Sequence, residues 1–137
     1  MRGGTMSRKS ERDRADAGRF AYDGLDRVLH ERARLSILTS LVAQPDGAKF
    51  GDLRGLCTLT DGNLSRHLDV LHQAGLVEIW KGFEARRPQT IVRLSTDGRR
   101  RFIAYLEELE RVVRDALPKA ESAPARSKQM PPGWQPA

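Results

Sequence analysis

Four small or hydrogen-bonding residues lie close together near the middle of this 137-residue sequence: Gly62, Asn63, Ser65 and Arg66. Arginine can donate two hydrogen bonds to the edge of guanine, asparagine can pair with adenine, and small residues let the backbone come close to a partner. At the start of a helix, such residues suit the major groove of DNA. On these residues alone, an ordinary solvated helix face is an equally good interpretation, so the surrounding elements must decide.

The segment that would carry these side chains is predicted to be a helix. Thr60 is suited to cap its start, because its side-chain oxygen can accept a hydrogen bond from a free backbone N–H. Leu64, Leu68 and Leu71 recur at helical spacing and define one apolar face. Gly75 suits the left-handed conformation in which helices often end. At about 100° per residue, the four residues fall opposite or beside the leucines.

Two helices are predicted ahead of this one. Residues 25–43 carry an apolar stripe at helical spacing, and Pro45 and Gly47 then mark a turn. After a short extended piece, residues 50–56 form a short helix whose Phe50, Leu53 and Leu56 are expected to face inward. Two helices joined by a short turn, the second presenting side chains suited to base edges, indicate a helix-turn-helix.

A basic loop between two strands follows. Residues 76–80 and 90–94 are rich in β-branched or aromatic residues and are predicted to be strands. Residues 81–89 between them are predicted to be a loop, marked by Gly82 and Pro88 and carrying Lys81, Arg86 and Arg87. A basic loop between strands, directly after a recognition-type helix, is typical of the wing of a winged helix.

The last helix is predicted to begin at Ser95 and to be stopped by Pro118. Its apolar residues form one broad stripe: Phe102, Tyr105, Leu106, Leu109, Val112, Val113, Ala116 and Leu117. Because a domain of this size has little core left to cover such a stripe, part of it is expected to face a second copy of the chain.

The net charge of +6 is unevenly distributed. Residues 23–80 carry six basic and eight acidic residues, for a net charge of −2, whereas residues 81–101 carry seven basic and two acidic, for +5. A localised basic segment of this kind is the footprint expected of a nucleic-acid-binding protein. The alternative, a solvated run of charge without a partner, stays open here.

Composition also bounds the domain organisation. Residues 1–22 and 118–137 are poor in periodic apolar residues and are expected to be a disordered basic arm and a disordered Pro-rich tail, leaving one domain at 23–117. No apolar run approaches the roughly 20 residues of a membrane span, and no secretory segment follows the polar start. A single cysteine, Cys57, fits a reducing cytosol, so we expect a cytoplasmic protein.

The sequence gives little support for metal binding, redox sensing or catalysis. His67 and His72 lie about 140° apart around a helix, so they cannot share a metal, and neither a metal nor another cofactor is predicted. Cys57 fits a small buried residue better than a redox-sensing thiol, and His67 fits a packed histidine better than a ligand. The sequence has no Gly-rich phosphate loop and no Gly-x-Ser-x-Gly motif, which argues against an enzyme.

The residues LSRHLDVLHQAGLVE resemble the signature of the winged-helix regulators of the ArsR and MarR superfamily. The following KGFEARRPQTIVRLSTDGRRRF is similar to the wing and last-helix entry of its small "winged helix DNA-binding domain" subgroup. The likeness covers roughly residues 23–115. It implies an α+β fold with a three-helix core, a two-stranded wing hairpin and a C-terminal helix. It further implies a homodimeric transcriptional regulator, expected to be a repressor, on a palindromic DNA site, and it implies no particular effector.

On this interpretation double-stranded DNA is the partner, and both helix and wing supply contacts. The expected DNA-binding residues are Thr60, Gly62, Asn63, Ser65, Arg66 and His67 on the helix and Lys81, Arg86 and Arg87 on the wing. The expected dimer contacts are Phe102, Tyr105, Leu106, Leu109, Val112 and Val113. Asp69 on the DNA-facing side would pair with Arg66 or accept from cytosine. A winged helix used only for protein–protein contact, with its basic loop on an acidic partner, is the alternative.

Overall fold

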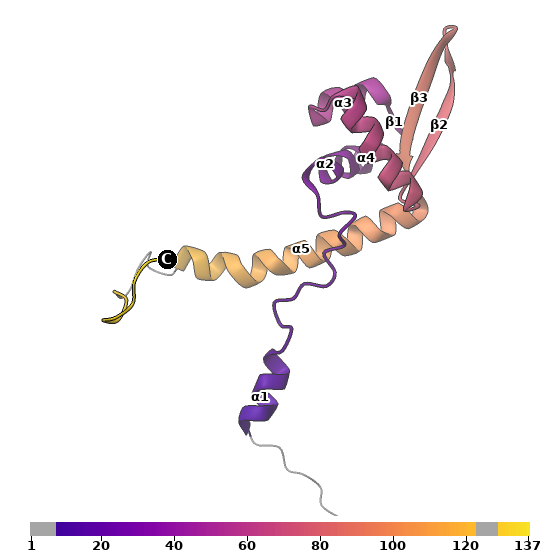
Figure 1. Cartoon of the computed structure of the whole chain (residues 1–137). Helices are drawn as coiled ribbons and strands as arrows, with labels where there is room; N and C mark the ends of the chain where they lie inside the picture. Colours follow the sequence, from indigo (N-terminus) through magenta and orange to yellow (C-terminus); the bar gives the residue numbers. More distant parts are fainter. Residues whose placement is uncertain (1–7, 123–128) are drawn as a thin grey trace, which may run out of the picture.

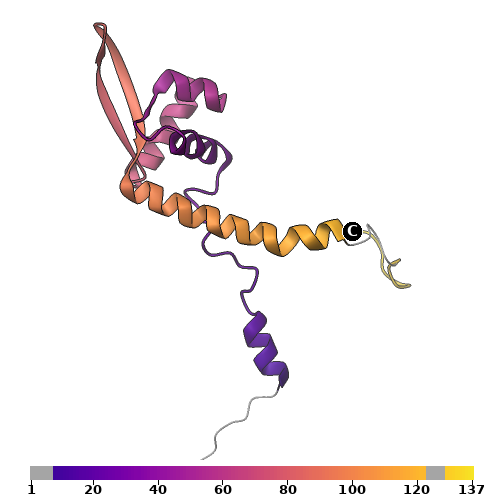
Figure 2. The ribbon, with the colours of Figure 1, turned by 180° about the vertical axis from the view of Figure 1, so that it is seen from behind.

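The computed structural model describes residues 8–122 and 129–137. Its elements, in chain order, are α1 (Arg8–Asp16), α2 (Arg32–Val42), β1 (Ala48–Lys49), α3 (Phe50–Cys57), α4 (Asp61–Gln73), β2 (Val77–Glu84), β3 (Arg87–Leu94) and α5 (Thr96–Ser122). Helices α2, α3 and α4 gather beside the sheet, α5 runs outward from the base of the hairpin, and α1 stands apart from this body (Figures 1 and 2). The α+β winged helix predicted from the sequence is therefore confirmed.

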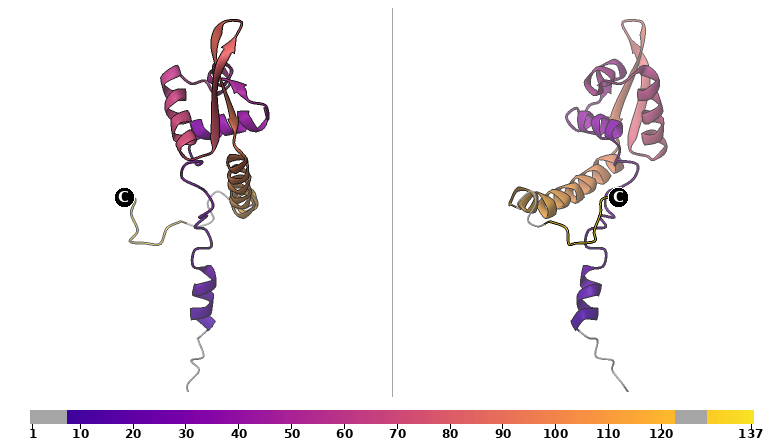
Figure 3. Two further views of the ribbon diagram at one scale, coloured as in Figure 1. Left: turned by 90° about the vertical axis from the view of Figure 1, so that its right-hand side faces the viewer. Right: turned by 60° about the vertical axis from the view of Figure 1, so that its left-hand side comes forward.

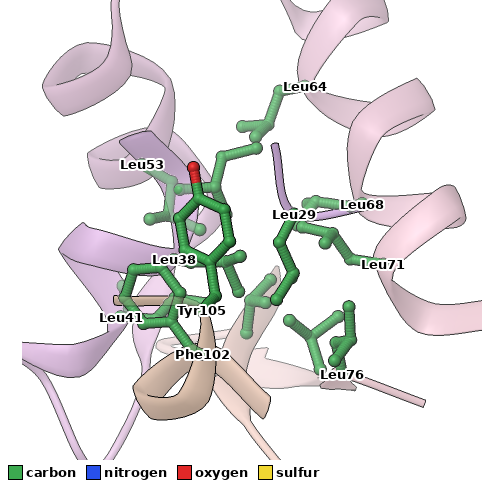
Figure 4. Close-up of a cluster of buried hydrophobic side chains, with 14 residues drawn as sticks. Leu29, Leu38, Leu41, Leu53, Leu64, Leu68, Leu71, Leu76, Phe102 and Tyr105 are labelled. Atoms are coloured by element: carbon green, nitrogen blue, oxygen red, sulfur yellow. The ribbon is translucent and has the colours of Figure 1, made fainter. Parts of the chain in front are cut away.

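Helix α4 forms as its local signals predict. Thr60 is the N-cap and its side chain accepts a hydrogen bond from the backbone N–H of Asn63, and Gly75 ends the segment with φ of +74°. Leu64, Leu68 and Leu71 are buried. In Figure 4 these three side chains meet leucines of α2 and α3 and the two aromatic rings of α5. The core thus fixes which face of α4 is left for solvent.

The helix predicted over residues 25–43 is shorter than expected and begins at Arg32, with Glu31 as N-cap. Ahead of it the chain turns, because the Asp26 carboxylate accepts from the backbone N–H of Val28 and also pairs with Arg101 of α5. Leu29 is nevertheless buried. The apolar residues of 25–31 therefore pack against the core, although this segment is not part of the helix.

In α3 one of the three residues expected to face inward does not. Leu53 is fully buried and Phe50 packs partly against the core, but the side chain of Leu56 is 63% exposed. Leu56 lies near the end of α3, where the chain leaves the helix through Thr58 in the left-handed conformation.

The wing is longer and more regular than predicted. β2 and β3 pair antiparallel over their whole length, from Val77 opposite Leu94 to Glu84 opposite Arg87, and their tip projects beyond the helices (Figures 1 and 3). Gly82 and Pro88, interpreted above as loop residues, lie inside the strands. Pro88 is tolerated because β1 pairs only with the base of β3, which leaves that edge open for a residue without an N–H.

Helix α5 begins as predicted but does not end at Pro118. The hydroxyl of Ser95 accepts from the backbone N–H of Gly98 at 2.8 Å, which caps the start. The helix continues through Pro118 to Ser122. The N-terminal segment packs along this last part of α5: Tyr22 donates to Asp115 at 2.8 Å, and the Lys119 ammonium lies 5.9 Å from the centroid of the Phe20 ring.

Part of each end that was expected to be disordered is helical in the structure. Residues 8–16, placed above in a disordered arm, form α1, and residues 118–122 belong to α5. Residues 1–7 and 123–128 lie outside the described part of the chain, and 129–137 carry no helix or strand. Among the described residues, no helix is long and apolar enough to cross a membrane.

Candidate nucleic-acid interface

The start of α4 presents the side chains that the sequence singled out. Gly62, Asn63, Ser65 and Arg66 are all exposed, on the side of the helix that the buried leucines leave free. A Cβ at Gly62 would meet no atom within 4 Å, so the backbone there is open to a partner. The Thr60 hydroxyl, 3.1 Å from the Asn63 nitrogen, is occupied by capping. It therefore holds the helix start in place, and its expected DNA contact stays a prediction.

The charges on this face differ from the expectation. Arg66 makes no hydrogen bond or ion pair with any described residue, so the predicted pair with Asp69 is absent. Asp61 instead accepts from Arg54 of α3 at 2.6 Å, and this bond raises the pKa of the Arg54 guanidinium. Sequence reasoning missed Arg54, because only the fold brings it to the first turn of α4. The Asp61 carboxylate is thus compensated, whereas Asp69 on the reading face is exposed and has no ion pair among the described residues.

His67 is turned away from this face. Its side chain is 12% exposed, and Nδ1 lies 3.7 Å from the Glu31 carboxylate and 3.4 Å from the Arg34 guanidinium of α2. Burial alone would raise the pKa of Glu31, but hydrogen bonds from the backbone N–H groups of Arg34 and Ala33 lower it below its ordinary value. The ring therefore packs against side chains of the N-cap and first turn of α2, as the packed histidine favoured by the sequence would. The contacts of His67 within the described chain are thus with α2, and its expected DNA contact stays a prediction.

The tip of the hairpin carries free positive charge. Lys81, Arg86 and Arg87 are exposed and make no side-chain hydrogen bond or ion pair with any described residue. Ala85 and Arg86 form the turn with φ of +50° and +67°, values that favour glycine or asparagine. The side chains of Arg86 in this turn and of Arg87 directly after it are exposed. This turn gave no sequence signal, because its residues are not the usual ones.

The remaining basic residues of 81–101 are mostly engaged. Arg93 pairs with Glu78 at 3.2 Å, Arg100 pairs with Asp97, and Arg101 pairs with Asp26 at 2.7 Å. The Arg101 guanidinium also donates to the carbonyl of Ala74 at the end of α4. Apart from Arg99, which is exposed and has no ion pair among the described residues, the basic residues near the base are paired, and those at the tip are not.

The reading helix and the wing form one surface. A hollow between them is floored by apolar side chains, and its rim carries Ser65 and Asp69 from α4 and Lys81 and Thr90 from the hairpin. Helix α4 runs toward the base of the hairpin and β2 returns from it, so the start of α4 and the tip lie toward the same end of the molecule (Figure 1). A single rod-like ligand could touch both.

The expected dimer residues divide into two sets. Phe102 and Tyr105 are 2% and 1% exposed and belong to the core of the chain itself, so they have no surface left for a partner. Leu109 also packs partly against this core. Val112 is half-buried. The large apolar residues of α5 that are exposed, by 40–49%, lie along one side of the helix: Ile103, Leu106, Val113 and Leu117. Only this second set could contact another copy.

Two further candidates contribute no site. Cys57 is half-buried, with Sγ 3.7 Å from the Ser40 hydroxyl. Within residues 8–122 and 129–137, no group of three or more His, Cys, Asp or Glu side chains could hold a metal ion.

Comparison with known proteins agrees with this geometry. A family model described as "Winged helix DNA-binding domain" matches residues 33–113. Uncharacterized protein MJ0432 of Methanocaldococcus jannaschii is 32% identical over 83 residues, covering 61% of this chain and 89% of the relative. A transcriptional regulator homologue from Pyrococcus horikoshii OT3 is 32% identical, with a TM-score of 0.61 over 64% of this chain and 86% of that chain. MarR shares the fold at 21% identity, with a TM-score of 0.57 over 81% and 84% of the two chains.

Proposed function

This chain belongs to the winged helix DNA-binding domain family, and we propose that it is a sequence-specific transcriptional regulator that binds double-stranded DNA as a homodimer. Helix α4 would enter the major groove, where Arg66 and Asn63 would reach base edges. The wing would lie on the adjacent backbone and minor groove. A dimer seated across a promoter would block access to it, so we propose repression.

One observation carries the proposal. Four cationic side chains without a carboxylate partner among the described residues, Arg66, Lys81, Arg86 and Arg87, stand on the surface shared by α4 and the wing, whereas Arg54, next to that surface, is held by Asp61. An unpaired charge breaks no ion pair when it moves to a phosphate, but a paired charge must first give up its carboxylate. These four side chains could therefore bind a polyanion such as DNA without first breaking an ion pair.

The dimer part of the proposal rests on α5. Its exposed apolar side chains lie on one side of the helix, next to the side that covers the core. A contiguous apolar strip of this kind suits an isologous contact with a second copy. Two α4 helices related by a two-fold axis would then meet half-sites about one DNA turn, or a multiple of it, apart.

The deciding experiment is a selection of bound duplexes from a random library, followed by titration of the wild type and Arg66→Ala on the selected site and on random DNA. We expect Arg66→Ala to cost about 1–3 kcal/mol at the selected site and to relax the preference at one position in each half-site. Random DNA should be affected much less. If Arg66→Ala weakened binding to the selected and the random duplex equally, Arg66 would be only a phosphate contact.

Oligomeric state is tested separately by sedimentation at micromolar concentration. The wild type should be a dimer and Val113→Asp a monomer, whereas Ala104→Asp, on the opposite side of α5, should stay dimeric. A monomeric wild type would refute the dimer. A protein that binds no DNA even at low salt would instead favour the winged helix as a protein-contact module.

A further inference from the structure

The wing carries an apolar side chain at an unexpected place. Phe83 is 79% exposed, the largest value among the large hydrophobic residues of the described chain. It lies one residue from the end of β2, and its partner across the hairpin is Pro88. Residues directly opposite in an antiparallel pair have Cβ atoms about 5 Å apart, so the ring and the proline form one small apolar unit.

The face on which Phe83 stands follows from the alternation of β2. Side chains of a strand alternate between its two faces, so Phe83 shares a face with Ile79 and Lys81. Ile79 packs against the core, and Lys81 lines the hollow beside α4. Phe83 therefore continues, beyond the body of the domain, the face that turns toward the reading helix. Trp80, also exposed at 54%, lies on the opposite face.

The charges around Phe83 indicate its partner. Lys81 precedes it on the same face, and Arg86 and Arg87 follow at the turn, all without a carboxylate partner. Glu84, the only acidic residue of the tip, is held by Lys49 at 2.7 Å. An aromatic ring set among free cations suits a negatively charged surface that has an apolar layer beneath it. The minor groove of DNA has both, with phosphates at its edges and sugars and base steps at its floor.

We propose that Phe83, backed by Pro88, is an apolar wedge that enters the minor groove beside each half-site and reads how easily a base step there opens. The inference rests on the proposed function, since it needs DNA on the α4 surface. Phenylalanine and proline are among the side chains that insert between base steps from the minor groove. Pyrimidine–purine steps such as TpA unstack most cheaply. Phe83 thus adds sequence preference outside the contacts of α4, whereas Arg86 and Arg87 add affinity without preference.

The test uses the full chain and duplexes carrying the selected site, in which flanking steps are changed one at a time from TpA to GpC. The wild type should prefer TpA at one step on each side. Phe83→Ala should lose roughly tenfold on the TpA duplex, as expected for an apolar side chain no longer buried, and little on the GpC duplex. Phe83→Leu should keep part of the preference. Trp80→Ala, an exposed aromatic of the same strand on the other face, should behave as the wild type.

A second measurement reports on the wedge directly. With 2-aminopurine placed in turn at each flanking position, binding of the wild type or Trp80→Ala should raise the emission at one step, because unstacking relieves its quenching. Phe83→Ala should leave the emission low. Because the ring is exposed, the melting temperature of Phe83→Ala should stay close to that of the wild type, which separates this result from misfolding.

The outcomes are distinguishable. If the wild type binds the selected duplex but Phe83→Ala binds both flanks as the wild type does, the wedge is refuted and the proposed function stands. Equal weakening on both flanks without a change in emission would also refute it, since Phe83 would then contact only the backbone. A wild type that binds no duplex refutes the proposed function and the wedge together.

Discussion

The two ends of the β2–β3 hairpin use the same residue types in opposite ways. At the base, polar groups are engaged: the Ser95 hydroxyl donates to the Gly75 carbonyl at 2.6 Å and accepts from Gly98, and Arg101 bridges Asp26 and the end of α4. At the tip, Arg86 and Arg87 are exposed and unpaired. The hairpin is therefore held at one end and available at the other.

The difference shows why a count of charges does not locate a binding surface. Summed over the sequence, 81–101 is one basic segment. In the folded chain, an arginine whose carboxylate partner lies in another element stabilises the fold, and an arginine without one remains free for a ligand. Within 81–101 the unpaired cations of the described chain are concentrated at the tip, with Arg99 as the exception at the base. The predictions below separate stability at the base from DNA binding at the tip.

The largest effect is expected at the base, for Gly98→Ala. A Cβ at Gly98 would lie 1.9 Å from the backbone carbonyl oxygen of Leu76, where the start of α5 meets the start of the hairpin. Because backbone atoms cannot rotate away, the elements must separate, and we expect a loss of about 3 kcal/mol or more in the free energy of unfolding. Chemical denaturation measures it.

The control is Gly55→Ala, at a glycine of α3 whose Cβ would meet no atom within 4 Å. Alanine should be neutral or stabilising there, by up to about 1 kcal/mol. If Gly98→Ala proved as stable as Gly55→Ala, the close packing of α5 on the hairpin base would be wrong.

At the tip, Arg86→Ala combined with Arg87→Ala should weaken DNA binding and leave the stability of the fold nearly unchanged. Each cation that neutralises a phosphate releases a counterion, so the log–log salt dependence should become shallower by about 1–2 per protomer. Selected and random DNA should weaken by similar factors, of the order of tenfold at low salt. The melting temperature should hardly change, since exposed substitutions seldom affect stability.

The matched control removes two charges from the base, in Arg99→Ala with Arg100→Ala. Its salt slope should stay close to that of the wild type. An unchanged slope in the tip variant, with full affinity, would show that the wing does not touch DNA and would favour the protein-contact alternative.

The same contrast explains what could be predicted from the sequence. Helix α4 was predictable because its cap, its leucines and Gly75 are local signals that agree. The wing length was not, because Gly82 and Pro88 are ordinary loop markers and the real turn uses Ala85 and Arg86. The strand pairing that overrides those markers is a contact between segments, which no local pattern contains.

In the candidate site, too, features set by local pattern could be predicted and contacts between elements could not. The exposure of Gly62, Asn63, Ser65 and Arg66 could be predicted from helical periodicity. The pairing of Asp61 with Arg54 could not, because it depends on the angle between α3 and α4. For the same reason, Phe102 and Tyr105 were assigned to a dimer contact although the fold buries them.

A smaller loss is expected for Arg101→Ala, about 1 kcal/mol in stability at neutral pH, because its hydrogen bonds are only partly shielded from solvent. The hydrogen bond from Arg101 lowers the pKa of Asp26 below its ordinary value of 3.8. A carboxyl with a lowered pKa stabilises the fold above its ordinary pKa, and this contribution is lost as the pH falls through that value to the folded pKa.

Unfolding curves between neutral pH and about pH 3 should therefore converge for Arg101→Ala and the wild type. Arg100→Ala, which removes a charge 79% exposed, serves as the control and should parallel the wild type at every pH. A constant gap between Arg101→Ala and the wild type across this range would mean that the Asp26 pair contributes nothing and that only packing of the arginine matters.

The smallest effect, and the only gain in DNA affinity, is expected for Glu84→Gln. Glu84 holds Lys49 at 2.7 Å, and this bond raises the pKa of the lysine. Removing the carboxylate makes the tip more positive and releases Lys49, so the affinity for selected and random DNA should rise a few-fold at low salt. The gain should shrink as salt increases, because exposed charges are screened over a Debye length of about 10 Å at 0.1 M. The melting temperature should stay nearly constant, since both partners are about half exposed. A fall in affinity would show that the Lys49–Glu84 pair orients the wing, and the tip would then be a positioned element whose charge alone does not explain binding.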